Sequence, residues 1–279
     1  MQKKYLTVFI ATLLAGTALF GSKIDDYVIK AEKSKVANNP NLKLKKINIS
    51  YKKKLDKQWT GYVVDVVINV NGSDQRVKDI VYTDGKKFVN NLYDLKTGQD
   101  FKDKMSVSLT KEFYNNKFLV YGSKKAKNKM VVFSDPLCPI CVQYMPKMLN
   151  DVRYKSKNLA LYYIPMPLNM HHTAKTIAKA AILAKHDGIK DVDYKIYTGR
   201  FSDFFNPYKE KNQQVALDTF NRIMGTKYKL SDLEKKFIKQ EMELADKLAL
   251  KAMVSGTPTV FYNGEKDKTR NKYLKTIKK

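Results

Sequence analysis

The sequence predicts a mixed α and β protein with two domains: a small α+β domain with an antiparallel sheet, then an α/β domain that carries a helical insertion. Two observations lead to this class. Strand-like runs in the first half flank Asp84-Gly85, a dipeptide typical of β-hairpin turns. The second half orders its apolar runs as strand, helix, strand, long helical stretch and strand, which is the order of an α/β sheet with an insertion. A chain of 279 residues is long enough for both domains.

The first residues have the pattern of a secretory signal peptide. Lys3 and Lys4 precede an apolar stretch over residues 5–20, and small residues follow it. A membrane anchor is the alternative, but a bilayer needs about 20 apolar residues and this stretch is shorter. We therefore assign residues 1–21 to a cleavable signal peptide and expect a periplasmic protein, in a compartment where disulfides persist.

Residues 22–101 are expected to form the first domain. The predicted elements are one amphipathic helix over residues 24–36 and four strands over residues 42–51, 62–70, 77–82 and 87–95. Gly85 favours a type I′ turn between the last two strands, because that turn needs positive φ angles. Nothing in this domain suggests catalysis, since it contains no histidine and no cysteine.

Residues 102–116 are polar, with Met105, Leu109 and Phe113 at helical spacing, and predict a linker helix. Residues 117–279 are expected to form the second domain, with a helical insertion over about residues 171–252. Its other predicted elements are strands over residues 118–121, 130–133, 158–166 and 259–262 and a helix from the cysteines to Tyr154.

The charge is strongly basic, with 53 Lys and Arg against 27 Asp and Glu. Clustered cations are the footprint of nucleic-acid binding. Only five of these cations are arginine, the residue that phosphate and base-edge contacts favour. We therefore expect no nucleic-acid partner.

Both cysteines of the chain lie in one unit, Cys138-Pro139-Ile140-Cys141, after an apolar run. A structural disulfide normally closes a longer loop, and a zinc site needs about four ligands. The three histidines lie downstream without metal-ligand spacing, and Val142 stands where haem attachment requires a histidine. The pair therefore predicts reversible thiol–disulfide chemistry with no metal and no cofactor beyond a redox-active Cys138–Cys141 disulfide.

The spacing also divides the roles of the two thiols. Cys138 at a helix start is the expected nucleophile, because backbone N–H groups and the helix dipole favour a thiolate there. Cys141, one turn later and less exposed, is expected to resolve the mixed disulfide. Pro139 fits the first helical turn, and Ile140 cannot hydrogen-bond the thiolate, which predicts a milder oxidant than a polar residue would give.

Three nearby features have alternative interpretations. Asp135 precedes a proline and is expected as a turn or cap residue, with a proton-shuttle role toward Cys141 as the alternative. His171-His172 are expected to begin a helix or to face solvent, with a role near the cysteines as the alternative. Pro258 precedes a strand, where a trans proline is ordinary.

Residues 132–141, Val-Phe-Ser-Asp-Pro-Leu-Cys-Pro-Ile-Cys, resemble the active-site segment of the thioredoxin superfamily, and within it of periplasmic disulfide isomerases of the DsbC and DsbG type. Gly256-Thr257-Pro258 is similar to their cis-proline loop, and residues 82–86 to a segment of their N-terminal domain. The resemblance covers about residues 24–264. It implies a thioredoxin fold with a helical insertion, preceded by a cystatin-like α+β dimerisation domain. It also implies a cis Pro258 and a Thr257 backbone that pairs with the substrate.

The chain departs from this pattern in two places. Thioredoxin and DsbA carry a buried acid where this chain has Val132, and DsbA usually has valine where this chain has Thr257. Both differences favour the isomerases. Pro139 is instead shared with DsbA and DsbG, so the choice between isomerase and oxidase stays open.

The expected protein is thus an exported homodimeric thiol–disulfide oxidoreductase that acts on mispaired or unfolded secreted proteins as an isomerase or reductase. A membrane thiol–disulfide reductase or oxidase would recycle it. The alternatives are a net thiol oxidase of the DsbA type and, in another class, a periplasmic chaperone in which the cysteines are secondary.

Overall fold

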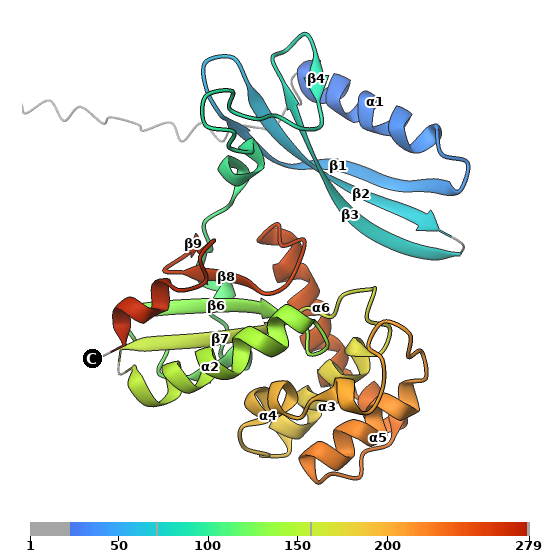
Figure 1. Ribbon diagram of the computed structural model, residues 1–279. Coiled ribbons are helices and arrows are strands. Elements are labelled where there is room, and N and C mark those ends of the chain that lie inside the picture. The colour runs from blue at the N-terminus through green and yellow to red at the C-terminus, as the bar shows by residue number, and fades with distance from the viewer. Residues whose placement is uncertain (1–22, 71, 157, 278–279) are drawn as a thin grey trace, which may run out of the picture. The chain divides into compact units, whose positions relative to one another are not determined.

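The computed structural model describes residues 23–70, 72–156 and 158–277, and it divides into two compact units between Met105 and Ser106 (Figure 1). The predicted signal peptide, residues 1–21, lies outside the described residues. None of the helices in the described ranges is long and apolar enough to cross a membrane.

Unit 1 is one helix and an antiparallel sheet. Its elements are α1 (Lys23–Ala37), β1 (Leu42–Lys54), β2 (Thr60–Val70), β3 (Ser73–Thr83) and β4 (Phe88–Val89), and the strands lie in the order β1-β2-β3-β4. Alternate residues of β2, among them Val64 and Val66, pack with Val28 of α1 in one apolar cluster. The helix therefore covers one face of the sheet (Figure 1).

The predicted hairpin at Asp84-Gly85 forms, but its turn and second strand differ from the prediction. Thr83 pairs with Phe88, so the turn is longer than the two residues of type I′. Gly85 has a positive φ of 90°, whereas Asp84 uses its carboxylate to accept the backbone N–H groups of Lys86 and Lys87 at 2.9 and 2.7 Å. This side-chain-to-backbone bonding stabilises the longer turn instead. The strand predicted over residues 87–95 is only the two residues of β4.

The predicted linker helix over residues 102–116 is wrong. Residues 101–118 contain three short 3-10 turns, Phe101–Met105, Lys111–Phe113 and Asn116–Phe118, and residues 106–110 between the first two are not helical. Leu109 donates its N–H to the Gly264 carbonyl oxygen at 2.8 Å, which removes it from any helical ladder. Met105, Leu109 and Phe113 are spaced four residues apart, but they do not form one helical face. All three are buried, Met105 in unit 1 and the other two in unit 2.

Unit 2 is a five-stranded sheet with helices on both faces, in the order β5-β7-β6-β8-β9. Strands β6 and β7 are parallel and the other pairs are antiparallel. Its strands are β5 (Leu119–Tyr121), β6 (Asn128–Ser134), β7 (Leu159–Pro165), β8 (Thr259–Tyr262) and β9 (Glu265–Lys266). Its α-helices are α2 (Pro139–Lys155), α3 (Ala174–His186), α4 (Val192–Thr198), α5 (Gln213–Met224) and α6 (Lys236–Lys251). Further 3-10 turns are Asn116–Phe118, Phe201–Asp203, Leu230–Glu234 and Lys272–Thr276.

The alternation along β6 separates two apolar cores in unit 2. Met130 and Val132 pack with α2 and the helical insertion, whereas Val131 and Phe133 pack with α6. The insertion lies between β7 and β8 in the chain, and α3, α4 and α5 gather into one group (Figure 1). The predicted α/β class with a helical insertion is confirmed, and the dimerisation role of the first domain stays a prediction.

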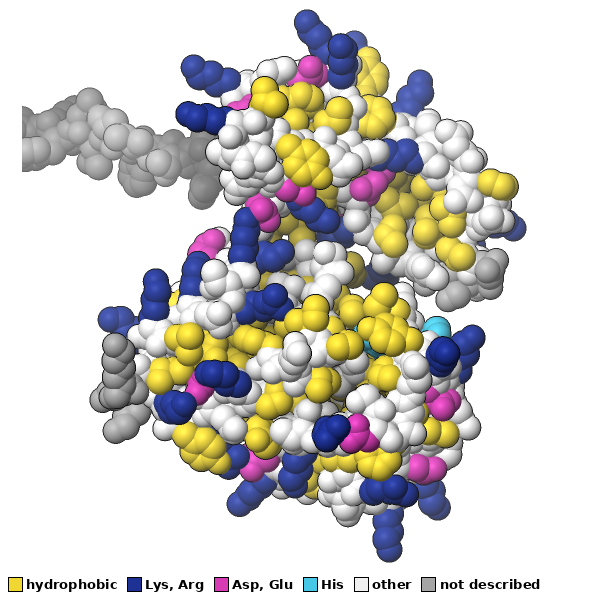
Figure 2. All heavy atoms as spheres, in the orientation of Figure 1, with side chains coloured by type: hydrophobic (Ala, Val, Ile, Leu, Met, Phe, Trp, Pro, Cys, Tyr) yellow, Lys and Arg dark blue, Asp and Glu magenta, His cyan; other side chains and the backbone are white. Residues whose placement is uncertain are grey.

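Charge is spread over the face of the molecule that Figure 2 shows. On the face shown in Figure 2, Lys and Arg side chains project from both units and are interleaved with acidic and apolar side chains. The net charge of +26 therefore acts as a distributed field on that face rather than as one basic patch.

Candidate active site

The cysteine pair lies where β6 gives way to α2. Cys138 is the N-cap of α2, with extended backbone angles of −69° and 122°, and its carbonyl oxygen accepts the N–H of Val142 at 2.9 Å. Pro139 occupies the first helical turn, where a backbone N–H has no intrahelical partner to lose. The structure thus confirms that the first cysteine begins the helix.

The two thiols are both free and differ in exposure. Cys138 retains 6% of its surface and Cys141 retains none. The Cys138 sulfur lies 3.5 Å from the Thr257 carbonyl oxygen, to which it can donate when it is protonated, and the Thr257–Pro258 peptide bond is cis, as predicted. The fold therefore brings the predicted substrate-binding residues to the first cysteine, although 119 positions separate Cys138 from Thr257.

The ionisation of the two thiols differs more than their exposure. The pKa of Cys138 is lowered to about 5, chiefly because Cys141 donates a hydrogen bond to its sulfur. Burial opposes this, while Thr257 and the backbone N–H groups of Cys141 and Ile140 add to it. The pKa of Cys141 is raised well above its ordinary value, first by burial and then by its bond to Cys138. Cys138 is thus a thiolate at neutral pH, and Cys141 is not.

The two intervening residues face outward. Pro139 and Ile140 are exposed, and the Ile140 side chain retains 52% of its surface beside the cysteine pair. An isoleucine side chain has no donor for a thiolate. The low pKa of Cys138 is therefore set by Cys141 and by backbone N–H groups, and the predicted tuning of the redox potential by these two residues stays a prediction.

Asp135 is fully buried in the loop before α2. One carboxylate oxygen accepts the N–H of Leu137 at 2.7 Å, and the other accepts the N–H of Leu168 at 2.7 Å and contacts His171 Nδ1 at 2.8 Å. The predicted turn role is confirmed by the bond to Leu137. The backbone N–H of Asp135, not its carboxylate, bonds Cys141, which does not favour the proton-shuttle alternative.

His171 is a residue that sequence reasoning misplaced. It neither begins a helix nor faces solvent, because α3 starts at Ala174 and only 2% of His171 is exposed, whereas His172 is exposed. Burial lowers the pKa of His171, but the hydrogen bond and charge of Asp135, together with the Cys138 thiolate, raise it above its ordinary value overall. No local pattern could have shown this, since Asp135 lies 36 positions away.

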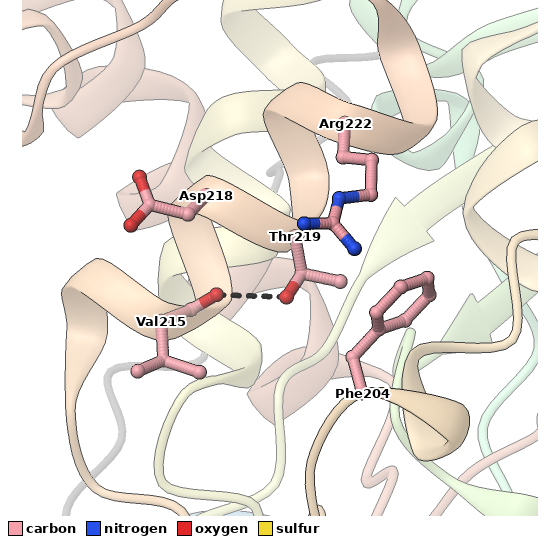
Figure 3. A pocket seen from close by; sticks show the side chains of 5 residues that line it. All are labelled: Phe204, Val215, Asp218, Thr219 and Arg222. Atoms are coloured by element: carbon pink, nitrogen blue, oxygen red, sulfur yellow. Dashed lines mark hydrogen bonds between the residues drawn. The ribbon is translucent and has the colours of Figure 1, made fainter.

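A shallow cavity of about 300 Å³ lies elsewhere in the helical insertion (Figure 3). Its lining residues are Phe204, Val215, Asp218, Thr219 and Arg222. Thr219 satisfies its hydroxyl by donating to the Val215 carbonyl oxygen at 2.8 Å, and Arg222 lies 5.4 Å from the centre of the Phe204 ring. None of the predicted site residues lines this cavity.

Solved structures of three proteins are similar to part of this chain. A thioredoxin-like oxidoreductase from Silicibacter pomeroyi is similar at 20% identity and a TM-score of 0.47, over 57% of this chain and 88% of that one. A periplasmic thioredoxin-like protein from Salmonella enterica serovar Typhimurium is similar at 19% identity and a TM-score of 0.44, over 56% and 83%. BdbD from Bacillus subtilis is similar at 17% identity and a TM-score of 0.43, over 61% and 91%. A search of curated proteins gave no match.

The family comparison is more specific. The family model described as Thioredoxin matches residues 115–279, which is more than half of the chain and contains both cysteines and Pro258. The fold observed over these residues is of the thioredoxin type, as the sequence predicted. The chain therefore belongs to the thioredoxin family.

Proposed function

We propose that the protein is an exported thiol–disulfide oxidoreductase that acts on mispaired or misfolded secreted proteins as a disulfide isomerase or reductase. The observation that carries the proposal is the asymmetry of the cysteine pair. Cys138 is a thiolate with a pKa of about 5 at a helix start, and Cys141 is a buried thiol one turn below it. Membership of the thioredoxin family supports the general class.

The chemistry follows from this asymmetry. The Cys138 thiolate attacks a client disulfide, one client sulfur leaves as a thiolate, and a mixed disulfide forms. In reduction, Cys141 then attacks Cys138, closes the Cys138–Cys141 disulfide and releases the client as a thiolate. In isomerisation, a second client thiol attacks the mixed disulfide, so the client forms a new disulfide and Cys138 is regenerated with no net electron transfer.

The loop at Thr257 supports a protein substrate. Its carbonyl oxygen lies beside the nucleophilic sulfur, and such a backbone group suits an extended client segment. The proposal assigns Thr257 and Pro258 to client binding. It assigns export to the periplasm, a homodimer and a recycling membrane reductase on the sequence alone.

A net thiol oxidase is the second candidate, and one observation favours it. A stabilised Cys138 thiolate stabilises the reduced form, which makes the disulfide form more oxidising. The absence of a donor at Ile140 and the similarity of Thr257 to the isomerases favour the first candidate. A chaperone in which the cysteines are secondary is the third.

Reactivation of scrambled ribonuclease in a glutathione buffer tests these candidates. The wild type and Cys138→Ala are compared, and Cys141→Ala is included because an isomerase needs Cys138 more than Cys141. Recovery that Cys138→Ala abolishes and Cys141→Ala partly retains is the expected result. No recovery, from folded wild type that cycles between its redox forms, would leave net oxidation as the better account.

The chaperone is separated by a second assay on the same variants. Suppression of client aggregation is measured for the wild type and for Cys138→Ala. Full suppression by Cys138→Ala, combined with no ribonuclease reactivation by the wild type, would contradict the proposed enzymatic function.

A further inference from the structure

A chain of three buried hydroxyl groups leads from Cys141 into the core of unit 2. The Tyr163 and Tyr197 hydroxyl oxygens are 2.9 Å apart, and Tyr197 donates to Ser134 Oγ at 2.7 Å. Ser134 is fully buried, as Cys141 is, and its hydroxyl lowers the pKa of the Cys141 thiol. All four side chains are buried, and they come from β7, α4, the end of β6 and α2.

The hydrogen bonds of this chain have one direction. Each hydroxyl has a single proton to donate. The Tyr197 proton goes to Ser134, so Tyr163 must donate to Tyr197, and the Ser134 proton is left for the Cys141 sulfur. Bonds aligned in this way polarise one another in a low-dielectric interior, which strengthens the last donor.

The resolving step needs such a donor. Cys141 must be a thiolate to attack, yet its burial raises its pKa. Thioredoxin carries a buried acid at the position of Val132. In this chain the Val132 side chain is apolar and fully buried, so it offers no such group. The Asp135 carboxylate is already bonded to Leu137, Leu168 and His171.

Ser134 opposes the effect of burial on the Cys141 pKa. Its hydroxyl lowers the pKa of Cys141, and the backbone N–H of Asp135 lowers it further. Burial raises the pKa of Tyr163 and of Tyr197 well above the ordinary value, so both phenols stay protonated and remain donors.

We propose that the Ser134–Tyr197–Tyr163 hydroxyl chain stabilises the Cys141 thiolate while Cys141 resolves the mixed disulfide. In this proposal Ser134 donates to the reacting Cys141 sulfur and is the catalytic residue, and Tyr197 and Tyr163 are positioning residues. The proposal rests on the proposed thiol–disulfide function.

Cys141 first gives its proton to a buffer base, and its thiolate attacks the Cys138 sulfur. The Cys138–Cys141 bond forms, the bond from Cys138 to the client sulfur breaks, and the client thiolate takes up a proton from water.

A single-turnover reaction of the reduced full-length protein with dithiobisnitrobenzoate separates the two steps. Attack by Cys138 releases the first thionitrobenzoate, and resolution by Cys141 releases the second. The variants are Ser134→Ala, Tyr197→Phe and Tyr163→Phe. The matched control is Tyr162→Phe on the same strand, since Tyr162 is also buried and its hydroxyl has no hydrogen-bond partner among the described residues. Circular dichroism checks that each variant is folded.

The expected result is an unchanged first phase and a slower second phase. Ser134→Ala should slow resolution by about tenfold, because it loses the bond to the charged sulfur. Tyr197→Phe should slow it by a smaller factor, because it removes only the bond that polarises Ser134. The midpoint of the second phase against pH should rise with Ser134→Ala and Tyr197→Phe and stay unchanged with Tyr162→Phe. A merely structural role would lower the rate at every pH without moving this midpoint.

Two results overturn different claims. The hydroxyl chain alone is refuted if the first phase is normal and the second phase keeps its rate and midpoint in folded Ser134→Ala. The same unchanged second phase must also be seen in Tyr197→Phe or in Tyr163→Phe. No first phase in the wild type refutes the proposed thiol–disulfide function itself.

Discussion

The Cys138 sulfur depends on a neighbour for its charge. Its pKa falls to about 5, and the largest cause is the hydrogen bond that Cys141 donates, ahead of the backbone N–H groups at the helix start. A helix N-terminus alone therefore does not account for the thiolate. Cys141 thus stabilises the Cys138 thiolate before any mixed disulfide forms.

Removing this neighbour should raise the Cys138 pKa. We expect the midpoint of thiolate absorbance against pH to lie near 5 in reduced wild type and to rise by about one unit in Cys141→Ala. Cys138→Ala should show no thiolate between about pH 4 and 8, because burial raises the Cys141 pKa. An equal midpoint in wild type and Cys141→Ala would show that the helix start alone sets the charge.

The buried Asp135–His171 pair predicts a pH-dependent contribution to stability. The folded-state pKa of His171 is raised, so its contribution is fully present below its unfolded pKa of about 6.5 and is lost as the pH rises through the folded value. The free energy of unfolding in urea should fall by about 3 kcal/mol in His171→Gln at low pH, because a buried charge loses its partner, and by less at high pH. His172→Gln, at the exposed neighbour, should change it little at any pH.

At the scale of elements, the sequence predicted those features that depend on residues close together in the chain. The cysteine-led start of α2 and the positive φ of Gly85 in the first hairpin both follow from neighbouring residues. The failures have non-local causes. Leu109 donates its N–H to Gly264, and His171 bonds Asp135, across separations that no periodicity contains.

The residues of the candidate site also differ in whether the sequence could predict them. Cys138 and Cys141 stand out from spacing alone, whereas the place of Thr257 and Pro258 beside them followed from a family resemblance. The hydroxyls of Tyr163 and Tyr197 gave no signal, because a buried tyrosine in a strand or helix is by default a packing residue. Their meeting depends on how α4 packs in the folded unit.

The turn after β5 gives a test of close packing between elements. Gly122 has a φ of 80°, and a Cβ there would lie 2.2 Å from the Leu159 carbonyl oxygen at the start of β7. Gly188 has the same φ of 80° with nothing within 4 Å, so Gly188→Ala measures backbone strain alone, about 1 kcal/mol. Gly122→Ala should lower the free energy of unfolding by clearly more than this in urea denaturation. Equal losses would show that the strand can move aside.

At the scale of the whole molecule, the net charge should affect how fast a reagent reaches Cys138 more than it affects the thiol exchange step itself. A net charge of +26 attracts anionic reagents, and salt screens this attraction. The second-order rate of Cys138 with anionic dithiobisnitrobenzoate should fall several-fold between about 10 mM and 500 mM salt. The rate with cationic cystamine should rise over the same range, and parallel responses of the two reagents would refute steering by the protein field.

Because the sequence contains only two cysteines, replacing Cys141 with alanine would turn the protein into a covalent label for the clients that we propose. With Cys141 replaced by alanine, any sulfur joined to this chain is joined at Cys138, so every adduct has one attachment point and a fixed stoichiometry. The cross-linked peptide that contains Cys138 then identifies, by mass, which cysteine of the captured protein was attacked.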